Sequence, residues 1–227
     1  MAGAYTTIIF DCDGTLTDSE YLNNKANADT LAGLGFANYT TQYSIENFTG
    51  LTMSEIKSII EAREGRVIPD NYIPDYIRLV AEYQKIYLQP VAGALGAVEA
   101  LQKNFKTCVA SNGERSNVIN SLKQVGLYDD FGDARIFTKI QVARGKPAPD
   151  LFLFAAEQMG VPPASCIVIE DSQSGVQAGV AAGMHVIGFT ATHHDPEPGA
   201  QRLRELGAHQ VFRSWDEIVH YINSLMA

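Results

Sequence analysis

The sequence predicts an α/β fold: a parallel β-sheet covered by helices, with an all-helical segment inserted near the amino terminus. From residue 90 onward, short apolar runs alternate with helix-like stretches, which is the pattern of parallel strands joined by helices. Residues 17–89 show helical periodicity with no convincing strand. We therefore expect a catalytic core formed by residues 1–16 and 90–227, and a helical cap domain formed by residues 17–89.

The first strand is expected at residues 5–10, because this short run is apolar, β-branched and aromatic. Pro90 and Gly93 mark the return from the cap, since proline and glycine interrupt regular structure. The cap helices are expected at residues 22–34, 54–63 and 72–88. Core helices are expected at residues 94–104, 115–125 and 215–225. Two more are expected, one that begins after residue 149 and one that follows the strand at residues 166–169 and ends near residue 182. The remaining strands are expected to end at residue 111 and to lie at residues 135–138, 166–169, 185–189 and 210–212.

Two carboxylates follow the first expected strand, at Asp11 and Asp13. Open α/β sheets carry their chemistry at the carboxyl ends of strands. An aspartate there can attack an electrophile or hold a metal ion, and a second one can donate and accept a proton. Gly14 then allows a sharp turn. A solvated Asp-Gly turn explains the same residues, and this short motif alone does not decide between the two interpretations.

Two further motifs carry groups that suit an anion. Ser111 and Asn112 stand where a strand gives way to a helix, and hydroxyl and N–H groups at such a position bind anions. Lys146 precedes Pro147 in a segment that prolines restrict, so its ammonium is held at a rigid corner. Taken singly, the first motif is equally a plain helix N-cap and the second a solvent-facing lysine.

Glu170 and Asp171 close another apolar strand, and Ser172 is placed to cap the helix that follows. Adjacent acids repel each other unless a cation lies nearby, and Mg²⁺ prefers oxygen ligands. An exposed acidic turn is the alternative. If the strands are parallel neighbours, however, all four motifs converge on one point, which would contain the groups that phosphoryl transfer requires.

In order and spacing, residues 11–15, 111–113, 146–150 and 170–176 resemble the four motifs of the haloacid dehalogenase superfamily. The branch that the chain resembles is that of the beta-phosphoglucomutase-like phosphatases with a helical cap. This resemblance implies a three-layer Rossmann-like parallel sheet core with an inserted all-helical cap. It also implies a Mg²⁺-dependent hydrolase of phosphate monoesters, such as sugar phosphates.

The resemblance assigns roles to individual residues. Asp11 would be the nucleophile that forms an aspartyl-phosphate, and Asp13 would protonate the leaving group and then activate water. Lys146 would orient Asp11. The Mg²⁺ ligands would be Asp11, the main-chain carbonyl of Asp13 and Asp171, with Glu170 acting directly or through water.

The phosphate would be bound by Ser111 and Asn112, by the turn at Gly14 and Thr15, and by Lys146. Asp13 separates phosphatases from the related enzymes that cleave carbon–halogen bonds, because a halide leaves without a proton. We therefore expect a phosphate substrate.

A phosphosugar mutase is the first alternative. Beta-phosphoglucomutases carry a histidine soon after the first motif and basic residues in the cap's specificity loop. Here the corresponding positions include Tyr21 and Leu22, and residues 48–53 contain no lysine or arginine. A non-catalytic module that binds phosphorylated metabolites is the second alternative. Candidate residues for substrate selection are Glu20, Asn23, Asn24, Gly50 and Thr52.

Composition limits the remaining classes. The chain has 227 residues and a net charge of −9, which disfavours general binding to nucleic acid or to a membrane surface. Its three cysteines, its brief amino-terminal apolar run and the lack of a basic leader predict a cytoplasmic protein. We expect a monomer or weak homodimer acting on a small-molecule phosphate ester. The segment His193-His194-Asp195 is expected in an exposed loop, without a functional metal site.

Overall fold

The computed structural model describes residues 5–49 and 51–226, which form two compact units. One unit contains the described residues up to Asp18 together with those from Gln89 onward. The other spans Ser19–Leu88. The chain therefore leaves the first unit once and re-enters it once, so that the second unit is an insertion.

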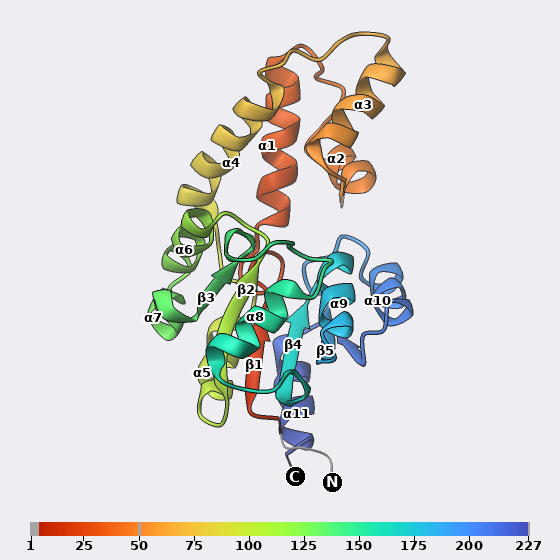
Figure 1. Cartoon of the computed structure of the whole chain (residues 1–227). Helices are drawn as coiled ribbons and strands as arrows, with labels where there is room; N and C mark the ends of the chain where they lie inside the picture. Colours follow the sequence, from red (N-terminus) through yellow and green to blue (C-terminus); the bar gives the residue numbers. More distant parts are fainter. Residues whose placement is uncertain (1–4, 50, 227) are drawn as a thin grey trace. The chain divides into compact units, whose positions relative to one another are not determined.

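Six strands in the described residues form one sheet, and all neighbouring strands run parallel in the order β3-β2-β1-β4-β5-β6. The strands are β1 Thr7–Phe10, β2 Lys106–Ser111, β3 Ile136–Thr138, β4 Cys166–Glu170, β5 His185–Phe189 and β6 Gln210–Phe212. Strand β1 lies between β2 and β4 in the middle of the sheet (Figure 1). Parallel neighbours need crossover connections, which the intervening helices supply. The predicted α/β fold with a parallel sheet is confirmed.

Helices cover both faces of this sheet. The α-helices of the first unit are α5 Ala94–Gln102, α6 Arg115–Gln124, α7 Tyr128–Phe131, α8 Asp150–Met159, α9 Gln173–Ala181, α10 Pro196–Glu205 and α11 Trp215–Ser224, and short 3₁₀ turns lie at Asp133–Arg135, Lys139–Gln141 and Pro163–Ser165. On the face covered by α8 and α9 (Figure 1), Ile9 of β1 belongs to the same buried cluster as Phe152. On the opposite face, Phe10 packs against Phe131 of α7 and Trp215 of α11. Alternate residues of one strand thus face two different helix layers.

The inserted unit is helical throughout its regular elements in the described residues: α1 Glu20–Gly33, α2 Thr41–Phe48, α3 Met53–Glu64 and α4 Tyr72–Tyr87. Its apolar cluster includes Leu31 of α1, Phe48 of α2, Ile60 of α3 and Tyr72 of α4. Because every helix contributes to this cluster, the insertion has a hydrophobic core of its own.

Helices α2 and α10 were not expected from the sequence. Helix α2 is short, and its start is fixed by Thr40, whose side chain accepts a hydrogen bond from the Tyr43 N–H. Helix α10 begins at Pro196, directly after the segment His193-His194-Asp195. This segment lies in a loop, as expected, and His194 and Asp195 are exposed, whereas His193 is half-buried. Asp195 followed by a proline in the first helical turn is a helix-start signal.

Candidate active site

Asp11 lies directly beyond the end of β1, at the centre of the sheet. Its backbone N–H donates to the carbonyl of Ile169 in β4 over 3.0 Å, which extends the parallel ladder past the strand. Phe10 is in register with Val109 of β2 and with Ile169. The residues that follow these three strands therefore meet at one edge of the sheet.

Lys146 connects two carboxylates at this edge. Its Nζ lies 2.6 Å from Asp11 Oδ1 and 2.5 Å from Glu170 Oε1. The same ammonium donates to the carbonyl of Ala110 over 2.7 Å, so each of its three donors has an acceptor. The side chain is only 2% exposed, and the ring of Phe152 lies 4.9 Å from Nζ. The position of this positive charge is therefore fixed.

The buried charges shift the pKa values of both Asp11 and Lys146. Burial and the negative charge of Glu170 raise the pKa of Asp11 to about 8, although Lys146 opposes the rise. Burial alone would lower the pKa of Lys146, but the charges and hydrogen bonds of the two carboxylates raise it above its usual value. Lys146 therefore stays protonated, but this one ammonium does not keep Asp11 readily ionised beside Glu170. A further cation would favour the ionised form of Asp11.

Glu170 is completely buried, and both of its carboxylate oxygens have partners. While Oε1 accepts from Lys146, Oε2 accepts from the backbone N–H and the hydroxyl of Ser172, over 3.0 and 2.9 Å. The hydroxyl oxygen of Ser172 also accepts from the Gly175 N–H, which makes it the predicted N-cap of α9. The first turn of α9 thus fixes Glu170, and Glu170 in turn holds Lys146.

Asp171 lies against the turn that follows β1. At Gly14, φ is +81°, a conformation that favours glycine. A Cβ atom built on Gly14 would lie 2.0 Å from Asp171 Oδ2. A larger residue would therefore both strain the turn and collide with the carboxylate.

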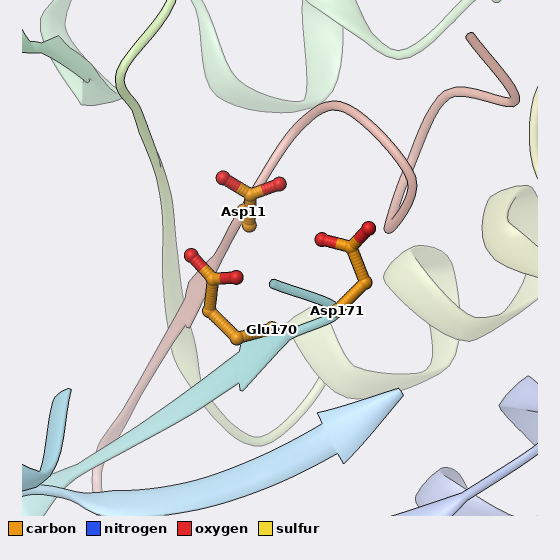
Figure 2. Close-up of side chains that lie close together, drawn as sticks. All are labelled: Asp11, Glu170 and Asp171. Atoms are coloured by element: carbon orange, nitrogen blue, oxygen red, sulfur yellow. The ribbon is translucent and has the colours of Figure 1, made fainter. Parts of the chain in front are cut away.

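Asp11, Glu170 and Asp171 each present one carboxylate oxygen within 4.8 Å of the others. Figure 2 shows these side chains projecting from the ends of β1 and β4 into the same region. Carboxylate oxygens are the ligands that Mg²⁺ prefers, and a divalent cation here would favour the ionised form of Asp11. The donor set fits a divalent cation.

Ser111 ends β2, and its hydroxyl and the Asp13 carboxylate both lie near Gly113. A Cβ atom built on Gly113 would lie 3.2 Å from Ser111 Oγ and 3.9 Å from Asp13 Oδ2. The Gly113 N–H donates to Ser111 Oγ over 3.0 Å, which leaves the hydroxyl proton of Ser111 able to donate to an anion. A hydroxyl at the end of β2 and a carboxylate in the turn after β1 thus both lie beside Gly113.

Two residues expected to bind phosphate make their contacts within the protein. The N–H of Gly14 donates to the Thr17 carbonyl over 2.8 Å. Asn112 exchanges two hydrogen bonds of 2.9 Å with the backbone of Lys146, one from Nδ2 to the carbonyl and one from the N–H to Oδ1. The Asn112 side chain thus holds the loop that carries Lys146. Thr15, which follows Gly14 in the turn after β1, is completely buried.

The residues expected to select the substrate lie in the inserted unit. Glu20, Asn23 and Asn24 lie at the start of α1, where the Asn24 amide donates to the carbonyl of Glu20 over 3.0 Å. Thr52 caps α3 in a capping box. Gly50 lies outside the described residues. These contacts give Asn24 and Thr52 roles in their own helices, and the selection of substrate by Glu20 and Asn23 stays a prediction.

The contacts of the loop between β5 and α10 were not predicted from the sequence. Thr192 Oγ1 donates to the carbonyl of Gly14 over 2.9 Å, and His193 Nε2 lies 2.9 Å from the carbonyl of Asp171. The helix start at Pro196 was the signal available, because it makes this loop short and keeps it near the sheet edge.

Comparisons with known proteins agree with this geometry. A family model described as haloacid dehalogenase-like hydrolase matches residues 5–183, a span that contains all four motifs. The 6-phosphogluconate phosphatase of Escherichia coli (strain K12) is 30% identical over 191 residues, which cover 83% of this chain and 84% of that protein. The fructose-1-phosphate phosphatase YqaB of the same organism is 30% identical over 191 residues, which cover 82% of this chain and 97% of that protein.

A solved structure gives the same result for the fold. The HAD family hydrolase of Deinococcus radiodurans R1, solved with bound phosphate and sodium, matches with a TM-score of 0.86 and 29% identity. The match covers 100% of this chain and 98% of that one. The likeness therefore extends over both units of the chain.

Proposed function

This chain belongs to the haloacid dehalogenase-like hydrolase family, and on that premise we propose that it is a Mg²⁺-dependent phosphatase of small phosphorylated metabolites. The observation that carries the proposal is the buried cluster in which Lys146 joins Asp11 to Glu170. A nucleophilic carboxylate and a phosphate repel each other, so a site that brings them together needs fixed cations. Lys146 supplies the first of these.

Asp11 is the proposed nucleophile. Its carboxylate oxygen attacks phosphorus, the bond from phosphorus to the ester oxygen breaks, and an aspartyl-phosphate forms. Asp13 donates a proton to the departing alkoxide, which leaves as an alcohol. Asp13 then takes a proton from water, whose oxygen attacks the phosphorus of the intermediate. This releases inorganic phosphate and the Asp11 carboxylate, and leaves Asp13 protonated for the next turnover.

Mg²⁺ would be held by Asp11, Asp171 and the main-chain carbonyl of Asp13, with Glu170 contributing through water. The engagement of both Glu170 oxygens within the protein supports this indirect role. When bound, the ion would supply positive charge that offsets the substrate phosphate. The excess of carboxylates over ammonium groups supports the need for such an ion.

The transferring phosphate would be bound by the Ser111 hydroxyl and by the backbone N–H groups of Asn112 and Thr15. Lys146 would act on it through charge, because its three donors already have acceptors. The Asn112 side chain and Gly14 would contribute by shaping the loops that they hold.

A sugar phosphate is the proposed substrate class. Two relatives named as phosphatases of 6-phosphogluconate and of fructose 1-phosphate support this class. We further propose that residues 17–89 act as a cap that selects the substrate, with Glu20 and Asn23 of α1 as the candidate residues. A cap excludes bulk water and contacts the part of the substrate that does not react.

The proposed setting is the cytoplasm, with a monomer or weak homodimer as the acting form. Cys12, Cys108 and Cys166 are free and buried, which supports a reducing compartment. No helix within residues 5–49 and 51–226 is both long enough and apolar enough to cross a membrane.

The test is phosphate release from a panel of esters, measured with Mg²⁺ and with a chelator. The panel contains 6-phosphogluconate, fructose 1-phosphate, glucose 1-phosphate, nucleotides and small carboxylated esters. We expect Mg²⁺-dependent turnover of at least one sugar phosphate, its loss in Asp11→Asn, and its retention in Asp216→Asn. Asp216 is a matched control because it is an exposed carboxylate on α11.

Other outcomes would replace the proposal. Conversion of glucose 1-phosphate to glucose 6-phosphate without phosphate release would identify a mutase. Tight binding of a sugar phosphate without turnover would identify a binding module. A folded protein that hydrolyses no ester in the panel would refute the phosphatase.

A further inference from the structure

The loop between β5 and α10 contacts both active-site turns with adjacent side chains. Thr192 Oγ1 donates to the carbonyl of Gly14 over 2.9 Å. His193 Nε2 lies 2.9 Å from the carbonyl of Asp171, which can only accept, so this nitrogen carries the proton and donates. One side chain thus holds the turn after β1, and the next holds the turn after β4.

These two turns are the ones that touch at the candidate metal site. The backbone of Gly14 is so close to the Asp171 carboxylate that a Cβ atom would lie 2.0 Å from Oδ2. Thr192 and His193 hold the carbonyls of Gly14 and Asp171 from one loop. These contacts fix the spacing between the turn after β1 and the Asp171 carboxylate. The turn after β1 also contains Asp13, whose main-chain carbonyl is a proposed Mg²⁺ ligand.

His193 is itself held in place. Its ring lies against the first turn of α10, where a Cβ atom built on Gly199 would come within 2.3 Å of Nδ1. Its backbone N–H donates to the carbonyl of Thr190 over 3.3 Å. The ring is therefore confined between α10 and the carbonyl of Asp171 and has little freedom to turn away.

We propose that His193 and Thr192 are positioning residues that set the affinity of the site for Mg²⁺. Neither residue belongs to the four motifs, and neither supplies a metal ligand. They act through Asp171 and Gly14, whose carbonyls they hold. Side chains that orient metal ligands typically change metal affinity by about 10- to 100-fold when they are removed. This inference rests on the proposed Mg²⁺ dependence of the site.

The test measures Mg²⁺ binding by titration calorimetry on the full chain without substrate, alongside the Mg²⁺ dependence of phosphate release. In His193→Phe we expect Mg²⁺ to bind about tenfold more weakly, with kcat at saturating Mg²⁺ changed much less. His193→Gln should restore most of the affinity, because a glutamine amide places an N–H near the position of Nε2. His194→Phe is the matched control, since His194 is the exposed neighbour.

Variants of Thr192 test the inference independently if the histidine variants fold poorly. Thr192→Val removes the hydroxyl with little change in shape and should also weaken Mg²⁺ binding, whereas Thr192→Ser should not. Wild-type Mg²⁺ affinity in folded His193→Phe or in Thr192→Val would overturn the inference. So would equal weakening in His194→Phe.

The proposed function is judged by a different readout. If the wild-type chain binds Mg²⁺ but hydrolyses no ester, the proposed phosphatase activity is refuted. The Mg²⁺ affinities of the variants can still be compared with that of the wild type by calorimetry. A wild-type chain that hydrolyses esters while all variants keep its Mg²⁺ affinity would refute only the positioning role.

Discussion

The ammonium of Lys146 donates to the carboxylate of Asp11 over 2.6 Å, across 135 positions of sequence, in a place where both groups are buried. Glu170 accepts from the same ammonium on its other side. Removing solvent from these charges costs free energy that only their mutual contacts offset. The cluster is therefore tightly coupled, and a change in one member affects the other two.

Replacing Lys146 with methionine should leave two buried carboxylates without their counter-charge. We expect the free energy of unfolding in a chelator to fall by about 3–5 kcal/mol, and phosphatase activity to be lost. Urea denaturation measures the first effect. Lys139→Met is the control, because Lys139 is 46% exposed and lies 3.5 Å from Glu114. A loss of stability in Lys146→Met no larger than in this control would contradict the account.

Asp13→Asn should slow the hydrolysis of alkyl phosphates by about 10²- to 10⁴-fold, because an alkoxide leaves poorly without a proton. The loss should be much smaller for p-nitrophenyl phosphate, whose leaving group is stable as an anion. Comparing kcat for the two substrates checks this role. An equal loss for both would show that Asp13 does not protonate the leaving group.

Asp171→Asn should raise the Mg²⁺ concentration needed for half-maximal activity by at least about tenfold, because it weakens a proposed ligand. The same substitution should leave the metal-free protein no less stable, since it removes one of three carboxylates whose oxygens lie within 4.8 Å of one another. Activity titrations and urea denaturation in a chelator measure the two effects. A variant with unchanged Mg²⁺ demand would remove Asp171 from the metal site.

His185, at the start of β5, should make the protein less stable in mild acid. Burial and the nearby charge of His209 lower the pKa of His185 to about 4, from an ordinary value of 6.5. Between these values the unfolded chain binds more protons than the folded one, so stability falls as the pH drops through this window. The contribution is about 1–2 kcal/mol after allowance for partial exposure of the ring.

This effect is checked by urea denaturation at neutral pH and at about pH 4.5 in the wild type and in His185→Phe. The phenylalanine ring can still pack against Tyr221, which lies beside His185, but it cannot bind a proton. The variant should lose less stability between the two pH values. An identical loss in both proteins would assign the acid sensitivity to other groups.

The parallel sheet was predictable because its strands are short apolar runs separated by helical patterns, and β1, β4 and β5 lie close to where those runs fall. Helix α2 was missed because its eight residues give too little periodicity, and its N-cap at Thr40 is a weak signal without that support. Helix α10 was missed because prolines were taken as loop signals, although Pro196 lies in the first helical turn.

The convergence of Asp11 and Asp171 could be inferred from parallel topology, because each residue directly follows a strand, and Lys146 lies in the loop between β3 and α8. Individual partners could not be inferred. The sequence does not show that Asn112 uses its amide to hold the backbone of Lys146, or that His193 reaches the carbonyl of Asp171. Such contacts depend on loop conformation and on helix packing, which leave no periodic pattern in the sequence.

Asp11 is expected to carry the phosphoryl group during turnover. The most direct measurement is rapid quenching of the enzyme with its substrate, followed by borohydride reduction and peptide mass spectrometry, because borohydride converts an acyl phosphate to an alcohol. We expect homoserine at position 11 in the wild type, formed only when substrate and Mg²⁺ are both present. Unmodified Asp11 under conditions of active turnover, or reduction at a different carboxylate, would contradict this expectation.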